Sequence, residues 1–299
     1  MCLEPNKADT RIIQNIIFGI MTETDIGLLF IAGILPGLLG VLFYLVAVLV
    51  TVTLKPEKGP RGERFSWPQR LHALWGVSGV LSLFALVIGG IYGGIFTPTE
   101  AAGIGASGAF FIALIRRRLS LQSLIDTLVE SARTTTMIFV ILIGAEIFSN
   151  YVNIAGLPEL LSDWVVSFDL SAIAVIMLIM LVYVVLGTVL ESLSMIMLTV
   201  PVFYPLVLGL DLGDYSEALM DPDMALVWFG IIVVVITEIS LITPPVGLNV
   251  FVLKSMLDDV KLSTIFRGVT PFWIVDIVRL MTLILLPGLV LWLPNLMAN

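Results

Sequence analysis

The chain has little charge and almost no cysteine or histidine. Only 13% of its 299 residues are charged, 59% are hydrophobic, and the mean hydropathy is +1.08. Cys2 and His72 are the only residues of their types, which excludes an internal disulfide and a metal site built from several cysteines. Soluble domains do not reach this hydropathy. The composition therefore predicts an all-α, polytopic membrane protein.

Basic residues are missing over a long stretch, because no Lys or Arg lies between Arg133 and Lys254. Those present cluster at residues 55–70 and 116–118, which predicts that these two segments are cytoplasmic. The net charge of -8 argues against nucleic acid and against an anionic membrane surface as partners. Residues 1–15 are polar and no apolar core follows a basic start, so no cleavable signal peptide is expected.

The first spans follow from this charge pattern. An uncharged run at residues 26–54 ends at the first basic cluster and predicts one span. Residues 71–115 are too long for one span and have basic residues at both ends, so they should cross the membrane twice. Between the two crossings, Thr97, Pro98 and Glu100 have the sequence of a capping box, which begins a new helix.

The middle of the chain should begin on the cytoplasmic side and end outside. Apolar residues at helical spacing over residues 121–132 predict an amphipathic helix along the cytoplasmic interface. Residues 134–155 then predict a span outward, and the acidic residues 156–169 predict an outer loop.

About forty mostly apolar residues, 170–210, stand between two acidic loops, which places both ends on the outer face. Two arrangements fit: a pair of full spans, or a re-entrant hairpin whose tip lies within the membrane. The central turn, residues 187–194, has no basic residue, as a cytoplasmic loop usually would. A re-entrant hairpin is therefore favoured.

The next apolar run, about residues 224–253, contains the sequence TPPVGLN at residues 243–249. Pro244 and Pro245 remove two backbone hydrogen-bond donors, and Gly247 permits backbone conformations outside the helix. A continuous helix therefore cannot run through residues 243–249. A broken helix survives in hydrocarbon only if it lines a polar cavity or is buried in protein. A transport site is the first hypothesis, and a proline kink repaired by neighbouring helices is the alternative. Beyond it, a second interfacial helix at 262–269 and a last span at about 271–296 are expected.

Acidic residues inside membrane spans are rare and are functional candidates. Three are expected here: Glu146, Glu191 and Glu238. Hydroxyls, free carbonyls and carboxylates near the turn and the break are hard oxygen ligands that suit an alkali cation, and half-helix N-termini suit an anion. The alternative for Glu191 and Glu238 is a buried carboxyl that is hydrogen-bonded to backbone. The motifs of intramembrane proteases and of phosphate-binding loops are absent, so an enzyme is not expected.

Three motifs resemble a known family. They are GIFTPTEAA at residues 94–102, LTVPVFYP at 198–205 and EISLITPPVGLN at 238–249. In this order and spacing they resemble the large membrane subunit of tripartite ATP-independent periplasmic (TRAP) transporters, over about residues 18–296. The resemblance implies an elevator-type secondary transporter of the bacterial inner membrane, driven by sodium. It further implies a small membrane subunit (DctQ-like), a periplasmic binding protein (DctP-like), a carboxylate substrate and no cofactor besides the coupling Na⁺.

The family is built from two inverted repeats, and the chain resembles the end of the first and the whole of the second. Residues 1–15 stay unassigned, and 16–299 form the permease region. Within it, 16–169 are the end of the first repeat with scaffold and arm helices, 170–256 the second hairpin and broken helix, and 257–299 the interfacial helix and last span. The rest of the first repeat is expected from a longer gene or a separate polypeptide.

We therefore hypothesise one sodium site and one side of the substrate site where the hairpin tip meets the break. The tip contributes Gly187, Glu191, Ser192, Ser194 and Thr199, and the break contributes Glu238, Thr243, Pro244, Pro245, Gly247 and Asn249. The sodium ligand candidates are Ser192, Ser194, Thr243 and Gly247. The alternatives are a membrane assembly subunit that does not transport, and a cation/proton antiporter that uses Glu146 and Glu238.

Overall fold

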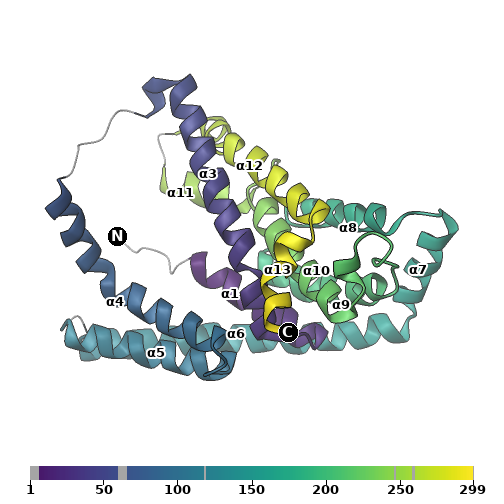
Figure 1. The fold of residues 1–299 in the computed structure, drawn as a ribbon, viewed down its shortest axis with the longest axis horizontal. Coiled ribbons are helices and arrows are strands. Elements are labelled where there is room, and N and C mark those ends of the chain that lie inside the picture. Colours follow the sequence, from purple (N-terminus) through teal and green to yellow (C-terminus); the bar gives the residue numbers. More distant parts are fainter. Residues whose placement is uncertain (1–6, 60–65, 118, 246, 258–259, 299) are drawn as a thin grey trace. The chain divides into compact units, whose positions relative to one another are not determined.

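A computed structural model describes residues 7–59, 66–117, 119–245, 247–257 and 260–298 (Figure 1). Val246 of the proline motif, residues 60–65 of the first basic cluster and Arg118 of the second lie outside the described residues. Within them all regular structure is helical, and six helices are long and apolar enough to cross a membrane. The prediction of an all-α polytopic protein is confirmed. The chain divides into two compact units, residues 57–140 and the remainder.

The smaller unit contains a helix pair, α4 (Trp67–Tyr92) and α5 (Pro98–Ile115). The two helices pack on each other, and the turn between them has the predicted capping box. Thr97 accepts a hydrogen bond from the Glu100 amide at 3.3 Å, and the Glu100 carboxylate accepts one from the Thr97 amide at 2.9 Å. These bonds satisfy two donors at the start of α5. The two crossings predicted within residues 71–115 are therefore two helices.

Helix α6 (Leu121–Ile154) corrects one boundary of the sequence analysis. It is continuous over 34 residues, so the expected interfacial helix and the span after it are one element. No proline or glycine occurs from residue 121 to 143, and apolar spacing alone does not show where a helix ends. The acidic segment expected to be a loop is also helical, since it contains α7 (Leu157–Ser167). Its charge indicates exposure and does not prevent helix formation.

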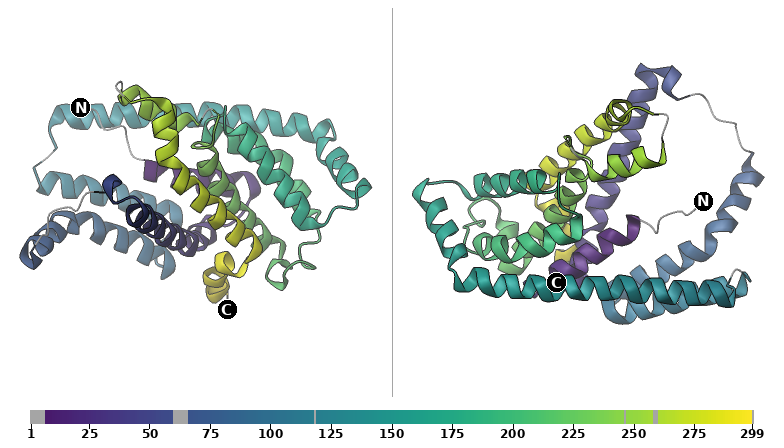
Figure 2. Two further views of the ribbon diagram at one scale, coloured as in Figure 1. Left: turned by 90° about the horizontal axis from the view of Figure 1, so that it is seen from above. Right: turned by 180° about the vertical axis from the view of Figure 1, so that it is seen from behind.

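Helix α10 (Pro222–Ser240) is the centre of the larger unit. An apolar stretch of 18 residues in α10 is 83% buried inside the protein. The helix contacts other helices on several sides (Figures 1 and 2). These neighbours are α1 (Lys7–Thr22), α2 (Ile26–Ala32), α8 (Ala172–Leu186), α9 (Ser192–Leu208), α12 (Leu262–Leu285) and α13 (Gly288–Ala298). Gly230 allows one close approach, because a Cβ there would lie 2.6 Å from the Phe18 ring of α1.

The remaining elements are short or peripheral to α10. Helix α3 (Ile34–Leu54) follows α2 across Gly33, whose backbone is helical, and together they form one apolar stretch of spanning length at residues 26–54, as predicted. Helix α11 (Leu248–Met256) packs on α12, and short 3₁₀ turns lie at Pro56–Lys58 and Glu217–Leu219. Helix α1 begins at Lys7, within the segment left unassigned by the sequence, and packs on α9.

The last span also begins and ends at other residues than expected. Helix α12 runs through Pro271 to Leu285, and the chain breaks at Pro287 instead. Proline at 287 leaves the carbonyl of Leu283 without its helical donor, and the buried Trp228 indole donates to that oxygen at 3.0 Å. The Tyr215 hydroxyl donates to the next carbonyl, Ile284, at 3.1 Å. Burial raises the pKa of Tyr215 above its ordinary value.

Candidate functional site

The two helices of residues 172–208 are too short to cross a membrane. Helices α8 and α9 contain 15 and 17 residues, or about 23 and 26 Å at 1.5 Å per residue, against a hydrocarbon core of about 30 Å. They contact each other and are joined by a short turn at residues 187–191. Of the two arrangements considered from the sequence, these lengths favour the re-entrant hairpin.

The hairpin tip is closed by caps at both helix ends. Gly187 is the C-cap of α8, and its amide donates to the Tyr183 carbonyl at 2.9 Å. Glu191 is exposed and is the N-cap of α9, where its carboxylate accepts from the Ser194 amide at 3.4 Å. The Ser192 and Ser194 hydroxyls lie 3.3 and 3.4 Å from the same carboxylate. A carboxylate at this position compensates the positive end of the helix dipole.

The tip lies directly on the last turn of α10. A Cβ on Gly187 would lie only 1.9 Å from the hydroxyl oxygen of Ser240 and 2.3 Å from its Cβ. Ser240 has no exposed surface, and its hydroxyl donates to the Thr237 carbonyl at 2.7 Å. Only glycine fits between the two elements. The structure thus brings together the hairpin tip and the broken helix, which the sequence analysis placed at one site.

The break itself spans residues 241–247, between α10 and α11. Gly247 has φ +58°, a left-handed conformation that glycine adopts without strain, and it is the N-cap of α11. The Asn249 amide donates across the break to the Leu241 carbonyl at 3.1 Å. The Pro244–Pro245 peptide bond is cis. The predicted interruption of the helix at the double proline is confirmed.

Thr243 is the side chain of the break with the best defined contacts. Its hydroxyl donates to the Ile239 carbonyl at 2.7 Å and accepts from the Trp273 indole of α12 at 2.9 Å. A hydroxyl oxygen has two lone pairs, so one remains for a further partner. Next to it lies a cavity of about 140 Å³. The cavity is lined by Ile242, Pro244, Phe266, Val269, Thr270 and Trp273.

The other predicted site residues have varied surroundings. Thr199 is 4% exposed and its hydroxyl lies 2.6 Å from that of Tyr183, so it joins the two arms of the hairpin. Glu238 is half-buried on α10, and Pro244 and Pro245 are exposed. Glu146 is exposed on α6, where Asn150 donates to its carboxylate at 3.2 Å. These positions leave the predicted binding roles as predictions.

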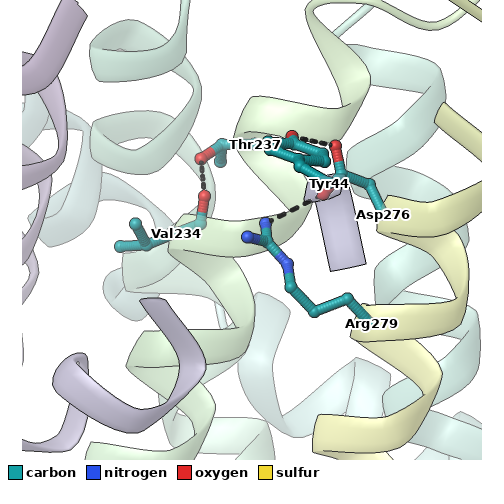
Figure 3. A network of polar contacts seen from close by, with 5 residues as sticks. All are labelled: Tyr44, Val234, Thr237, Asp276 and Arg279. Atoms are coloured by element: carbon teal, nitrogen blue, oxygen red, sulfur yellow. Dashed lines mark hydrogen bonds and ion pairs between the residues drawn. The ribbon is translucent and has the colours of Figure 1, made fainter. Parts of the chain in front are cut away.

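The sequence analysis missed a charged cluster within the predicted last span. Asp276 and Arg279 of α12 are 3% and 2% exposed and are paired at 3.3 Å, and the Tyr44 hydroxyl of α3 donates to Asp276 at 2.5 Å (Figure 3). The expected number of three intramembrane acids was therefore too low. An Asp and an Arg three residues apart inside an apolar run were the available signal. Ser240 and Trp273 gave no such signal, because their roles depend on which helices meet.

Apolar helices of spanning length, a hairpin of two shorter apolar helices and a helix broken at two prolines are the features of a multi-pass membrane protein. Residues 12–289 match the family model of the tripartite ATP-independent periplasmic transporter, DctM component, and the chain belongs to this family. The family consists of transporter subunits and not of enzymes, and its members are multi-pass proteins of the bacterial inner membrane.

Several relatives are similar over almost the whole chain. The C4-dicarboxylate TRAP transporter large permease protein DctM of Pseudomonas aeruginosa is 34% identical over 283 residues, which cover 94% of this chain and 62% of the relative. The sialic acid TRAP transporter large permease protein SiaM of Vibrio cholerae is 31% identical, with coverage of 94% and 62%. The 2,3-diketo-L-gulonate TRAP transporter large permease protein YiaN of Escherichia coli is 31% identical, with coverage of 92% and 62%. The chain thus spans 62% of the length of each of these relatives.

Proposed function

We propose that the chain forms the permease part of a sodium-coupled secondary transporter that imports a small carboxylate. The observation that carries this proposal is the contact of Gly187 at the hairpin tip with Ser240 beside the break. It joins two interrupted elements, and interrupted helices inside a membrane are where transporters bind ions and substrates.

The cation is assigned to the hydroxyls and backbone oxygens of this region. Sodium is a hard cation that prefers oxygen ligands, and Ser192, Ser194 and Thr243 supply hydroxyls from the tip and the break. Gly247, the left-handed N-cap of α11, supplies a backbone carbonyl, which in this structure accepts from the Val250 amide at 2.7 Å. Thr243 is the best supported of these ligands, because its two hydrogen bonds fix the direction of its remaining lone pair.

The substrate is assigned to the two half-helices that begin after the tip and after the break. The N-termini of α9 and α11 follow the tip and the break, and each is the positive end of a helix dipole, which at α9 faces the Glu191 carboxylate in this structure. An anion is the matching ligand. Relatives are named for C4-dicarboxylate, sialic acid and 2,3-diketo-L-gulonate, and a carboxylate is the group that these substrates share.

Transport also requires partners and movement. We propose two partner proteins for the chain. One is a small DctQ-like membrane subunit, and the other is a periplasmic DctP-like binding protein that delivers the carboxylate. A relative from Oleidesulfovibrio alaskensis is named isethionate TRAP transporter permease protein DctMQ, and the joined M and Q in its name support association with the small subunit. Isethionate is a sulfonate, so this relative shares the anionic charge of the substrate and not the carboxylate. In this proposal the hairpin and the broken helix move together through the bilayer in an elevator mechanism, since the close contact at Gly187 couples them.

The test is carboxylate uptake into liposomes that contain the chain with its membrane partner, supplied with the loaded binding protein. An inward sodium gradient should drive uptake, and replacing sodium by choline should abolish it. A proton gradient without sodium should have no effect, which separates this function from a cation/proton antiporter. Uptake that is equal in sodium and choline would contradict the proposal.

A further inference from the structure

Four residues form a polar connection between two membrane-spanning helices, which we name the α3–α12 joint: Gly40, Tyr44, Asp276 and Arg279. Tyr44 donates to one carboxylate oxygen of Asp276, and Arg279 lies 3.3 Å from the other (Figure 3). The guanidinium group lies close against α3, and a Cβ on Gly40 would lie 2.3 Å from one of its nitrogens.

Stability alone does not explain a buried ion pair at this place. Removing two charges from water costs several kcal/mol each, and apolar residues of similar volume often replace such a pair without loss of stability. Charged residues in a membrane span carry a further cost. The hydrogen bond from Tyr44 to Asp276 gives something that apolar packing does not, which is a fixed distance and direction. The joint therefore fixes how α12 is rotated on α3.

That rotation determines the contact between α12 and the break. Trp273 lies one turn before Asp276 on the same helix, and its indole donates to Thr243 at 2.9 Å. An atom about 6 Å from a helix axis moves by about 2 Å when the helix rotates by about 20°. Such a shift would break the bond to Thr243.

We propose that the α3–α12 joint is a positioning device for the proposed sodium site, acting through Trp273 on the Thr243 hydroxyl. Tyr44, Asp276 and Arg279 are then positioning residues that do not touch the ion. With Trp273 in place, one lone pair of Thr243 stays open, in one direction; without it, the bond to Ile239 alone orients the hydroxyl and both lone pairs are open. This inference rests on the function proposed above, with Thr243 as a sodium ligand.

The test uses the purified chain in detergent and fits the rise in stability with sodium concentration to RT ln(1 + [Na⁺]/Kd), with choline chloride as the reference. The fitted Kd is the half-maximal sodium concentration for binding. Tyr44→Phe removes the hydroxyl but keeps the ring, which packs edge-on against Phe272. Trp273→Phe removes only the indole donor and part of the ring. Each should raise the half-maximal sodium concentration about 3- to 10-fold, the effect of one lost hydrogen bond.

The double variant identifies the pathway. If Tyr44 acts through Trp273, the double variant should be no worse than the more affected single variant, because effects on one chain of contacts do not add. Gly40→Ala, which displaces Arg279, should shift the sodium constant in the same direction. Gly37→Ala is the matched control on α3, since its Cβ meets nothing within 4 Å, and it should leave the constant unchanged.

Three results would overturn the inference. Additive effects of Tyr44→Phe and Trp273→Phe would show two independent roles. A wild-type sodium constant in Tyr44→Phe, with only a lower unfolding temperature in choline, would show a merely structural role; Thr243→Val and Trp273→Phe would then still shift the constant, and the proposed function would stand. A wild-type sodium constant in Thr243→Val would overturn the sodium site and the positioning inference together.

Discussion

Two proline breaks interrupt the apolar helices of the larger unit, and they differ in how their backbone groups are satisfied. At Pro287 the freed carbonyls receive side-chain donors, from Trp228 to Leu283 and from Tyr215 to Ile284. At residues 241–247 the break is longer, is bridged by backbone bonds, and meets a second interrupted element. The first break is a repaired kink, and the second is a candidate site. Proline alone does not distinguish the two, but the donors that surround it do.

The largest expected effect is at the contact that only the second break has. Gly187→Ala should remove the sodium-induced rise in unfolding temperature, because the new Cβ would overlap Ser240 and push the hairpin tip away from the break. The measurement is thermal unfolding of the purified chain in sodium and in choline chloride.

A second substitution at Ser240 should restore the sodium response of the Gly187→Ala variant. The double variant Gly187→Ala and Ser240→Gly removes the two Ser240 atoms that the new Cβ would overlap and leaves the Tyr183 carbonyl oxygen at 3.1 Å, so at least part of the sodium effect should return. A Gly187→Ala variant with the sodium response of the wild type would show that the tip does not need to lie on the last turn of α10.

Trp228→Phe tests the repaired kink. It leaves the buried Leu283 carbonyl without its donor, so the free energy of unfolding should fall by about 1–3 kcal/mol. The loss should be equal in sodium and in choline, and the half-maximal sodium concentration should stay unchanged. A shift in that concentration would mean that the break at Pro287 also belongs to the site.

Tyr215→Phe should give the smallest effect at the same kink. Its hydroxyl bond to Ile284 is only partly buried, so about 0.5–1.5 kcal/mol of stability should be lost, again equally in both salts. Chemical denaturation of the two variants side by side would rank them. A larger loss for Tyr215→Phe than for Trp228→Phe would contradict the assignment of the indole as the main donor.

The sequence was sufficient to predict the elements that strong local signals delimit. The double proline with Gly247 predicted the α10/α11 break, and the capping box at Thr97 predicted the start of α5, since both act within a few residues. The ends of α6 and α12 were predicted wrongly. Helical spacing continues smoothly through residue 133, and Pro271 is tolerated inside α12.

Contacts between distant segments could not be predicted in the same way. Helices α4 and α10 are similarly apolar. Yet only 6% of an apolar 18-residue stretch of α4 is buried, against 83% of such a stretch of α10. Hydropathy measures the free-energy cost of exposing a side chain to water. It does not distinguish a helix that faces lipid from one that faces protein. The proximity of Gly187 to Ser240, and of Trp273 to Thr243, depends on that packing.

The most direct test of the central claim compares Thr243→Val with Trp228→Phe in one measurement of sodium-induced stabilisation. At sodium concentrations of about ten times the dissociation constant, binding should stabilise the unaltered chain by about 1.4 kcal/mol. We predict that Thr243→Val loses this increment and that Trp228→Phe keeps it in full. Loss of the increment in Trp228→Phe, with retention in Thr243→Val, would contradict the assignment of the site to the break at residues 241–247.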